Sequence, residues 1–210
     1  MSDFAVDPGA SKGERTREAV LRAAIAQFAV AGRRGTSVPS IARQVGITPS
    51  AVYVYFPTKQ ELFEAAVDTD VAELINEAIP DLVSGTFDGD FARIFGRLLE
   101  AVDEHPLSHR LLLGAEGIGA ERLAQTPAEG ALIAGIVAAI RDGQRAGTVR
   151  DDIDADDVAM GLWILVVSLL SMVLQAGGAY DPAYGGGVVA VLDAAIRPPR
   201  GNGSQTPRSE

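Results

Sequence analysis

The chain has 210 residues, which is enough for one large or two small domains with a buried core. Hydrophobic residues make up 47% of it and charged residues 22%, a composition typical of soluble globular proteins that excludes disorder of the whole chain. Because cysteine is absent, disulfide scaffolds, zinc–thiolate sites and cysteine nucleophiles are excluded.

Charge is distributed unevenly along the chain, whose net charge is −10. Residues 1–60 hold eight Lys/Arg against four Asp/Glu, whereas residues 61–210 hold ten against twenty-four. A basic first quarter followed by an acidic remainder is typical of a small polyanion-binding module joined to a body that does not bind polyanions. Uneven sampling of surface charge is the alternative, and the motifs decide between the two.

The two ends of the chain, residues 1–13 and 198–210, contain Gly, Pro and Ser with little apolar periodicity, and we expect them to be disordered. The first predicted helix runs from about Lys12 to Ala31. Its apolar residues recur at helical spacing, and Gly32 supplies a C-terminal stop.

Two short helices are predicted next, on either side of a glycine turn. Ser37 is the expected N-cap of the first, whose apolar residues follow i, i+3, i+4 and i+7 until Gly46 ends it. Thr48 and Pro49 are the expected N-cap and first residue of the second, which Pro57 stops. This is the helix-turn-helix arrangement, in which the second helix turns its N-terminal residues toward base edges in the major groove.

The remaining chain is also predicted to be helical. Thr58 and Glu61 match a capping box that starts a helix reaching about Ile79. Turn signals separate segments of helical length, and no run of alternating strands is found, so the predicted fold class is all-α. The further predicted helices cover residues 90–104, 106–115, 127–146, 154–176 and 182–196.

One segment is long enough to cross a membrane, because residues 158–180 contain no charged side chain. Ser168, Ser171, Gln175 and the acidic residues before it favour a buried core or interface helix over a membrane span. The amino terminus has no apolar run of signal-peptide length. We therefore expect a cytoplasmic protein.

The strings TREAVLRAAIAQF and AGRRGTSVPSIARQVGITPSAVYVYFPTKQELF resemble the DNA-binding domain of the tetracycline-repressor (TetR) family of bacterial transcription regulators. The resemblance implies a three-helix helix-turn-helix domain over residues 14–74, with the motif at about 37–56. It also implies a larger helical domain over 75–197 that binds an effector and dimerises. The residues that carry the resemblance are Phe28, Gly32, Thr36, Ile41, Ala42, Gly46, Val52, Tyr53, Tyr55, Phe56 and Lys59.

Several positions depart from the family pattern. Gln27 stands where the family usually has an apolar residue, and Arg33–Arg34 make the following loop more basic. The start of the predicted recognition helix, Pro49–Ser50–Ala51, and Val54 within it are also unusual. Since most of these lie near the base-reading surface, the resemblance implies DNA binding without implying an operator sequence.

The resemblance implies two kinds of DNA contact. Base edges are expected to meet the first turn of the recognition helix, because hydroxyl groups read either kind of base and an alanine methyl touches thymine. The residues in this turn are Thr48, Pro49, Ser50 and Ala51. The DNA backbone is expected to meet other side chains, with neither tyrosine ring directed at the core. These are Thr36, Ser37, Arg43, Tyr53, Tyr55 and Lys59, and for Arg43 the groove edge is the alternative.

Other motifs fail on spacing. An EF-hand starting at Asp152 would need Gly at its sixth position and Glu at its twelfth, where the chain has Asp157 and Trp163. His105 and His109 are four residues apart, but no third metal ligand is identifiable. Nucleotide-binding and hydrolase motifs are not found. We expect no metal, no cofactor and no enzymatic activity.

The second domain is expected to form a homodimer through residues 154–176 and 182–196, because such apolar helices need a nonaqueous neighbour. The expected function is a ligand-responsive repressor that binds double-stranded operator DNA and is released by a mostly apolar small molecule. The alternative is a small-molecule-binding or protein-interaction module of the same fold that does not bind DNA. The predicted pocket residues are Phe91, Phe95, Leu99, Leu112, Ile136, Met160 and Trp163.

Overall fold

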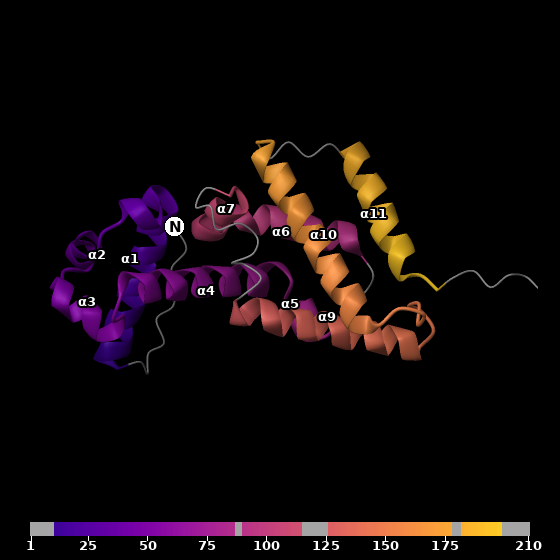
Figure 1. Ribbon diagram of the computed structural model, residues 1–210, viewed down its shortest axis with the longest axis horizontal. Coiled ribbons are helices and arrows are strands. Elements are labelled where there is room, and N and C mark those ends of the chain that lie inside the picture. The colour runs from indigo at the N-terminus through magenta and orange to yellow at the C-terminus, as the bar shows by residue number, and fades with distance from the viewer. Residues whose placement is uncertain (1–10, 87–89, 115–125, 178–181, 199–210) are drawn as a thin grey trace, which may run out of the picture.

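The computed structural model describes residues 11–86, 90–114, 126–177 and 182–198, and every regular element within these ranges is a helix. The molecule is elongated, with α1, α2 and α3 at one end and α9, α10 and α11 at the other (Figure 1). Helix α4 runs between the two ends. The predicted all-α fold is confirmed. We call α1–α3 the head and α5–α11 the body.

Helix α1 (Lys12–Gly35) begins with a capping box that the sequence analysis missed. The Ser11 hydroxyl accepts a hydrogen bond from the Glu14 N–H (3.2 Å), and the Glu14 carboxylate accepts one from the Ser11 N–H (2.7 Å). Gly32 interrupts the helix with φ of 68°, as its predicted stop requires, but a helical turn resumes over 33–35. The predicted loop after Gly32 is therefore wrong.

Helices α2 (Val38–Val45) and α3 (Pro49–Tyr55) have the predicted boundaries. The Ser37 and Thr48 hydroxyls accept hydrogen bonds from backbone N–H groups three residues later. Between the helices Gly46 adopts a left-handed conformation (φ 76°), which glycine reaches without the penalty that a Cβ brings. Local chemistry thus determines the turn of this motif.

Helix α4 (Lys59–Ala78) begins after Thr58, which caps it as predicted. It packs against α1 in the head and against α6, α7 and α9 in the body. Phe63 of α4 and Phe28 of α1 meet edge to face, with ring centroids 5.0 Å apart. The Arg22 guanidinium of α1 forms an ion pair with Glu73 of α4. A single helix therefore belongs to both ends of the molecule.

The body helices follow the predicted segments to within a few residues, except that α5 was not predicted and the predicted helix over 90–104 ends in a 3₁₀ turn, η1. Four proline residues stand at the first position of body helices, where a missing N–H is tolerated. The bounds are α5 Pro80–Val83, α6 Phe91–Ala101, η1 Val102–Glu104, α7 Pro106–Leu112, α9 Pro127–Arg145, α10 Ala155–Gln175 and α11 Pro182–Ile196.

Helices α5 and α9 approach each other closely at Gly135. A Cβ atom at this glycine would lie 2.1 Å from the Leu82 carbonyl oxygen and 3.0 Å from that of Val83. Only glycine allows the two backbones to meet at this separation. The contact encloses one side of the body interior.

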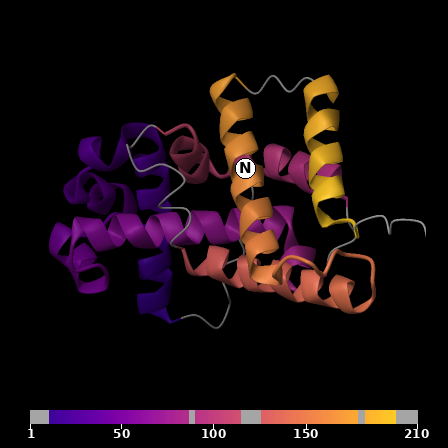
Figure 2. The ribbon, with the colours of Figure 1, turned by 45° about the vertical axis from the view of Figure 1, so that its right-hand side comes forward.

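Helices α10 and α11 lie on one side of the body (Figures 1 and 2). Within the described ranges α10 is the helix whose length and hydropathy would allow it to cross a membrane, and 39% of its most apolar window is buried. It packs against α6, α7 and α9, whereas α11 packs on α6. The Arg150 N–H donates to the Ile196 carbonyl (2.8 Å), which joins the end of α11 to the loop before α10.

Candidate nucleic-acid interface and ligand cavities

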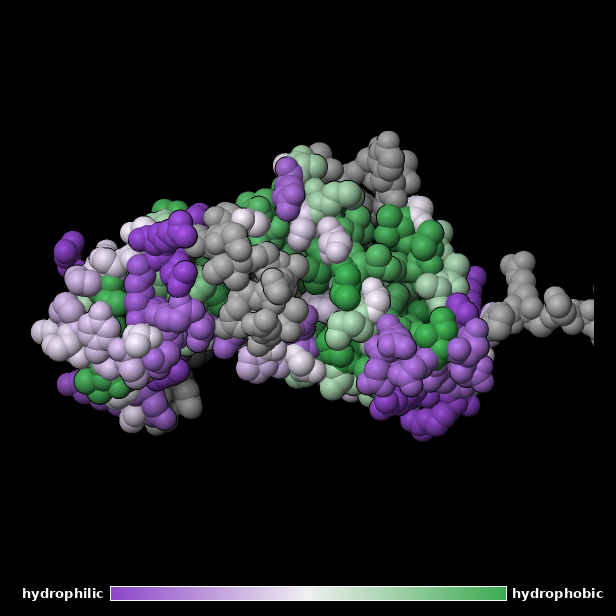
Figure 3. All heavy atoms as spheres, viewed as in Figure 1, coloured by the Kyte–Doolittle hydropathy of each residue, from purple (hydrophilic) through white to green (hydrophobic). Residues whose placement is uncertain are grey.

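The recognition helix α3 is anchored on one side and open on the other. Val52 is fully buried, whereas Thr48, Pro49 and Ser50 are exposed and Ala51 is half-buried. The Thr48 and Ser50 hydroxyl oxygens are 3.1 Å apart, so they form a hydrogen-bonded pair at the N-terminal turn. The predicted base-reading residues therefore stand together at the surface, where Figure 3 shows mainly hydrophilic residues.

Val54 belongs to the same exposed surface, near which the sequence placed it without assigning it a contact. Val54 is 78% exposed, and Tyr53 beside it is 45% exposed. An apolar side chain on the open face of α3 is suited to a thymine methyl group. The signal was available, because Val52 at the core places Val54 about half a turn away from the buried side.

Tyr55 corrects an expectation, because it packs against the hydrophobic core instead of standing clear of it. It lies three residues after the buried Val52 and so shares the inward side of the helix. Its hydroxyl group lies near the first turn of α1, since a Cβ added at Gly13 would be 4.0 Å from it. The ring is structural, while its hydroxyl faces the N-terminus of α1.

Thr36 is also placed differently from the prediction. It is 5% exposed, and its hydroxyl donates to the carbonyls of Gly32 (2.8 Å) and Gln27 (3.1 Å). The side chain therefore holds the corner between α1 and α2, and its burial is incompatible with the predicted DNA contact. Ser37 remains exposed. The unusual Gln27 donates from its amide to Gln44 of α2 (2.7 Å), which ties the same two helices together.

Basic residues in the head and at the start of α4 fall into two groups. Some are used internally: Arg22 pairs with Glu73, Arg17 lies 4.8 Å over the Phe56 ring, and Arg33 donates to Gln60. Among the residues that the structure describes, Arg43 and Lys59 take part in no ion pair. Lys59 stands at the first position of α4, where the helix N-terminus also attracts anions.

The body contains two apolar cavities that share Trp163 and Val166. The first, of about 430 Å³ including its part open to solvent, lies among α4, α5, α6, α9 and α10. The second, of about 440 Å³ on the same measure, lies among α4, α6, α7, α9 and α10, and we call it the Trp163 cavity. Both cavities are lined almost entirely by apolar side chains.

The cavities agree only partly with the predicted pocket. Phe91, Ile136 and Trp163 line the first cavity, and Leu112 and Trp163 line the second. Three predicted residues line neither cavity, because helical spacing identifies an apolar face without identifying what the face meets. Met160, for example, is 46% exposed on the outside of α10. The three are Phe95, Leu99 and Met160.

Two buried carboxylates lie in this region, and the sequence analysis identified neither. Glu129 of α9 is 6% exposed and accepts a hydrogen bond from the Trp163 indole N–H; burial raises its pKa. Asp70 of α4 accepts hydrogen bonds from the N–H (2.6 Å) and hydroxyl (2.7 Å) of Ser108, and burial is the main cause that raises its pKa. Such residues carry no local signal of burial.

The two histidines do not converge on one point. His105 Nε2 is 3.2 Å from Glu77 Oε2 and its Nδ1 is 3.9 Å from Asp70 Oδ1, whereas His109 Nδ1 is 3.7 Å from Asp103 Oδ1. In the described part of the chain, no group of three side chains is arranged to hold a metal ion.

Comparison with known proteins agrees with this geometry. Residues 20–66 match the model of bacterial regulatory proteins of the tetR family. The HTH-type transcriptional repressor SCO4008 of Streptomyces coelicolor is 33% identical over 174 residues, which cover 79% of this chain and 86% of that protein.

Solved structures show the same fold at lower identity. A TetR-family transcriptional regulator from Cytophaga hutchinsonii has a TM-score of 0.63 and 19% identity, over 90% of this chain and 98% of that one. Salmonella enterica GusR has a TM-score of 0.57 and 22% identity, over 89% and 97%. With the exposed recognition helix and the extended sequence match, the chain belongs to the TetR family of bacterial transcription regulators.

Proposed function

We propose that the protein is a repressor that binds a pseudo-palindromic double-stranded DNA operator as a homodimer and is released by a small, mostly apolar effector. It would act in the cytoplasm without chemistry of its own. The observation that carries the proposal is the open N-terminal turn of α3, where Thr48, Pro49 and Ser50 are exposed. The relative of 33% identity is itself named a transcriptional repressor.

On this proposal the DNA-binding domain, residues 14–74, divides its contacts between bases and backbone. Thr48, Pro49, Ser50 and Ala51 read base edges, with Val54 beside them. Ser37, Arg43, Tyr53, the hydroxyl of Tyr55 and Lys59 contact phosphate and sugar. The contacts of the second group fix the register of α3, and those of the first supply sequence preference.

The proposed dimer uses α10 and α11 of the second domain, residues 75–197. Met160, Ile164 and Met172 are about half exposed at spacings of four and eight residues, which places them along one face of α10. Val191 of α11 is 65% exposed. Figure 3 shows hydrophobic residues gathered over this side of the body. An apolar face of this kind favours burial against a second copy of the chain.

Effector binding would reach the head through α4 and α7. Val71, Leu74 and Ile75 of α4 line the Trp163 cavity, and α4 also carries Glu73, the partner of Arg22 in α1. Leu112 of α7 lines the same cavity, while the Arg110 guanidinium lies 3.4 Å from the Ala29 carbonyl of α1. A ligand that favours one arrangement of α4 and α7 would shift DNA affinity by about 1–3 kcal/mol of coupling.

Selection from randomised duplexes followed by gel shift tests the DNA-binding proposal. The selected sites should be pseudo-palindromic, and their affinity should fall steeply as salt is raised, because phosphate contacts release counterions. Absence of any retarded duplex at low salt would favour the alternative, a small-molecule or protein-interaction module. Light scattering tests the dimer, since a mass near 21.9 kDa at working concentration would contradict it.

A further inference from the structure

The Trp163 cavity has an uneven lining: one ionisable side chain among apolar ones. Its residues come from α4, α6, α7, α9 and α10. The polar groups in the lining are the side chains of Ser108 and Glu129 and the indole N–H of Trp163. The lining residues are Val71, Leu74, Ile75, Leu98, Ser108, Leu112, Glu129, Trp163, Val166, Val167 and Leu170.

Ser108 is already committed to another partner. Its hydroxyl donates to Asp70 Oδ2 (2.7 Å), and its N–H donates to the same oxygen (2.6 Å). This serine therefore has no hydroxyl proton left to offer a ligand. Glu129 is the lining residue that remains to give the cavity a charge preference.

Glu129 is turned into the body instead of back onto its own helix. It lies in the first turn of α9, three residues after the N-cap Thr126, which is the position of a capping-box glutamate. Its Oε1, however, accepts the indole N–H of Trp163 on α10. A carboxylate has about four acceptor positions on its two oxygens, so this single N–H leaves most of its negative charge uncompensated.

The apolar surroundings make this carboxylate selective for charge. Burial raises the pKa of Glu129, because the ionised form loses hydration. Attraction to a bound cation offsets the hydration energy that the ionised carboxylate loses on burial. A neutral molecule provides no such attraction, and an anion is repelled by the carboxylate. Trp163 strengthens the preference, since the indole ring is the side chain that attracts a cation most strongly to its face.

We propose that the Trp163 cavity selects a lipophilic monocation, a compact apolar body carrying one positively charged nitrogen that lies against Glu129 and Trp163. This inference rests on the proposed function, because it specifies the chemical class of the effector. The apolar lining from α4, α7 and α10 binds the body of such a molecule, and Glu129 determines its charge.

The chain provides its own probe, because Trp163 is its one tryptophan. Its fluorescence would be titrated, in the full-length protein without DNA, with three molecules of similar size. These are benzyltrimethylammonium, its neutral carbon isostere neopentylbenzene, and the anion benzylsulfonate. The cation should bind about tenfold or more tightly than the neutral isostere, the ratio that one desolvated cation–π contact supplies, and the anion should bind least.

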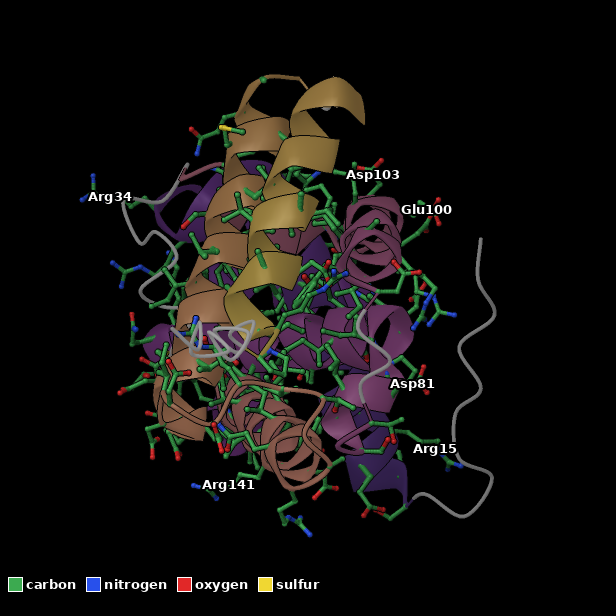
Figure 4. All side chains as sticks on the ribbon, turned by 90° about the vertical axis from the view of Figure 1, so that its right-hand side faces the viewer. Arg15, Arg34, Asp81, Glu100, Asp103 and Arg141 are labelled. Carbon is green, nitrogen blue, oxygen red and sulfur yellow. The ribbon has the colours of Figure 1, made fainter. Side chains whose placement is uncertain are left out.

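The matched variants are Glu129→Gln and Glu100→Gln, which remove the same charge from inside and outside the body. Glu100 lies on α6 and extends from the outer surface (Figure 4). Glu129→Gln keeps an oxygen for the Trp163 N–H but should abolish the preference for the cation over the neutral isostere. Glu100→Gln should leave the preference unchanged.

The outcomes separate this inference from the proposed function. Equal binding of the cation and its neutral isostere to the unmodified protein would overturn the inference while leaving an apolar effector site in place. Failure of all three molecules to bind would overturn both the inference and the effector site. DNA binding is measured independently by gel shift, and the ranking in the unmodified protein stands as a test even if Glu129→Gln fails to fold.

Discussion

The head and the body of this protein carry their candidate functional side chains in opposite places. In the head these side chains lie on the outside of α3, and short-range caps at Ser37 and Thr48 position them. In the body they line interior cavities, and contacts between helices far apart in sequence position them, such as Trp163 with Glu129. The comparison teaches that a DNA-reading surface can be specified by local chemistry, whereas a ligand cavity depends on how whole helices meet.

The largest expected effect concerns the body, where close packing leaves no room for change. Gly135→Ala would place a methyl group 2.1 Å from the Leu82 carbonyl oxygen, so α5 and α9 must separate. We expect a loss of about 2–3 kcal/mol in the free energy of unfolding, measured by urea denaturation.

Gly130→Ala is the matched control, because it lies on the same helix and an added Cβ would meet nothing within 4 Å. It should stabilise the protein by about 0.5–1 kcal/mol, since alanine is the better helix former. Equal effects of the two substitutions would mean that α5 and α9 are not in contact as described.

A second prediction tests how the body holds α7. Asp70→Ala removes the acceptor of two hydrogen bonds from Ser108 and should lower the free energy of unfolding by about 1–3 kcal/mol. Asp70→Asn, which keeps an acceptor oxygen, should cost less. If the two variants are equally unstable, the lost interaction is not the hydrogen bonding of Ser108.

The same pair predicts a pH dependence. Burial raises the pKa of Asp70 in the folded state above the 3.8 of an ordinary aspartate, with His105 and Glu73 as its charged neighbours. The folded state therefore binds this proton more strongly than the unfolded state, and the associated stability is lost as pH rises above 3.8. As pH rises above 3.8, the free energy of unfolding of Asp70→Asn should therefore increase relative to that of the unmodified protein. Urea denaturation across the range would measure the difference.

A third prediction separates positioning from reading in the head. Thr48→Ala removes the N-cap of α3 and should destabilise the protein by about 1 kcal/mol. Ser50 lies two residues after Thr48 on the exposed surface. Ser50→Ala should leave the thermal midpoint of unfolding nearly unchanged while altering base preference in the selected duplexes. If Ser50→Ala were the more destabilising of the two, the assignment of Thr48 to positioning and Ser50 to base reading would be contradicted.

The smallest expected effect is a single phosphate contact. Lys59→Ala should reduce the slope of log affinity against log salt by about 1 and weaken all duplexes alike. Arg141→Ala removes the same charge from the far end of the body, where Arg141 pairs with Asp156 and points outward (Figure 4). An equal change of slope from Arg141→Ala would show that net charge, and not the position of Lys59, governs the effect.

The sequence predicted the head better than the body for a physical reason. Ser37, Gly46, Thr48 and Pro57 act on residues within four positions, so their patterns can be read directly. Tyr55 shows the limit of such local patterns. Its ring was expected to point away from the core, but it packs on the same side of α3 as the buried Val52. In the body the helix ends were predictable from proline and glycine, but Phe95, Leu99 and Met160 of the predicted pocket line neither of the two described cavities.

Sequence alone therefore determined the all-α class, the boundaries of α2 and α3, and the capped turn that exposes Thr48 and Ser50. Each of these follows from backbone propensity and hydrogen bonds over a few residues. Tertiary structure decided that Thr36 is buried, that Gly135 meets Leu82, and that Glu129 faces Trp163. These depend on which helix faces pack together, and periodicity within one helix does not contain that information.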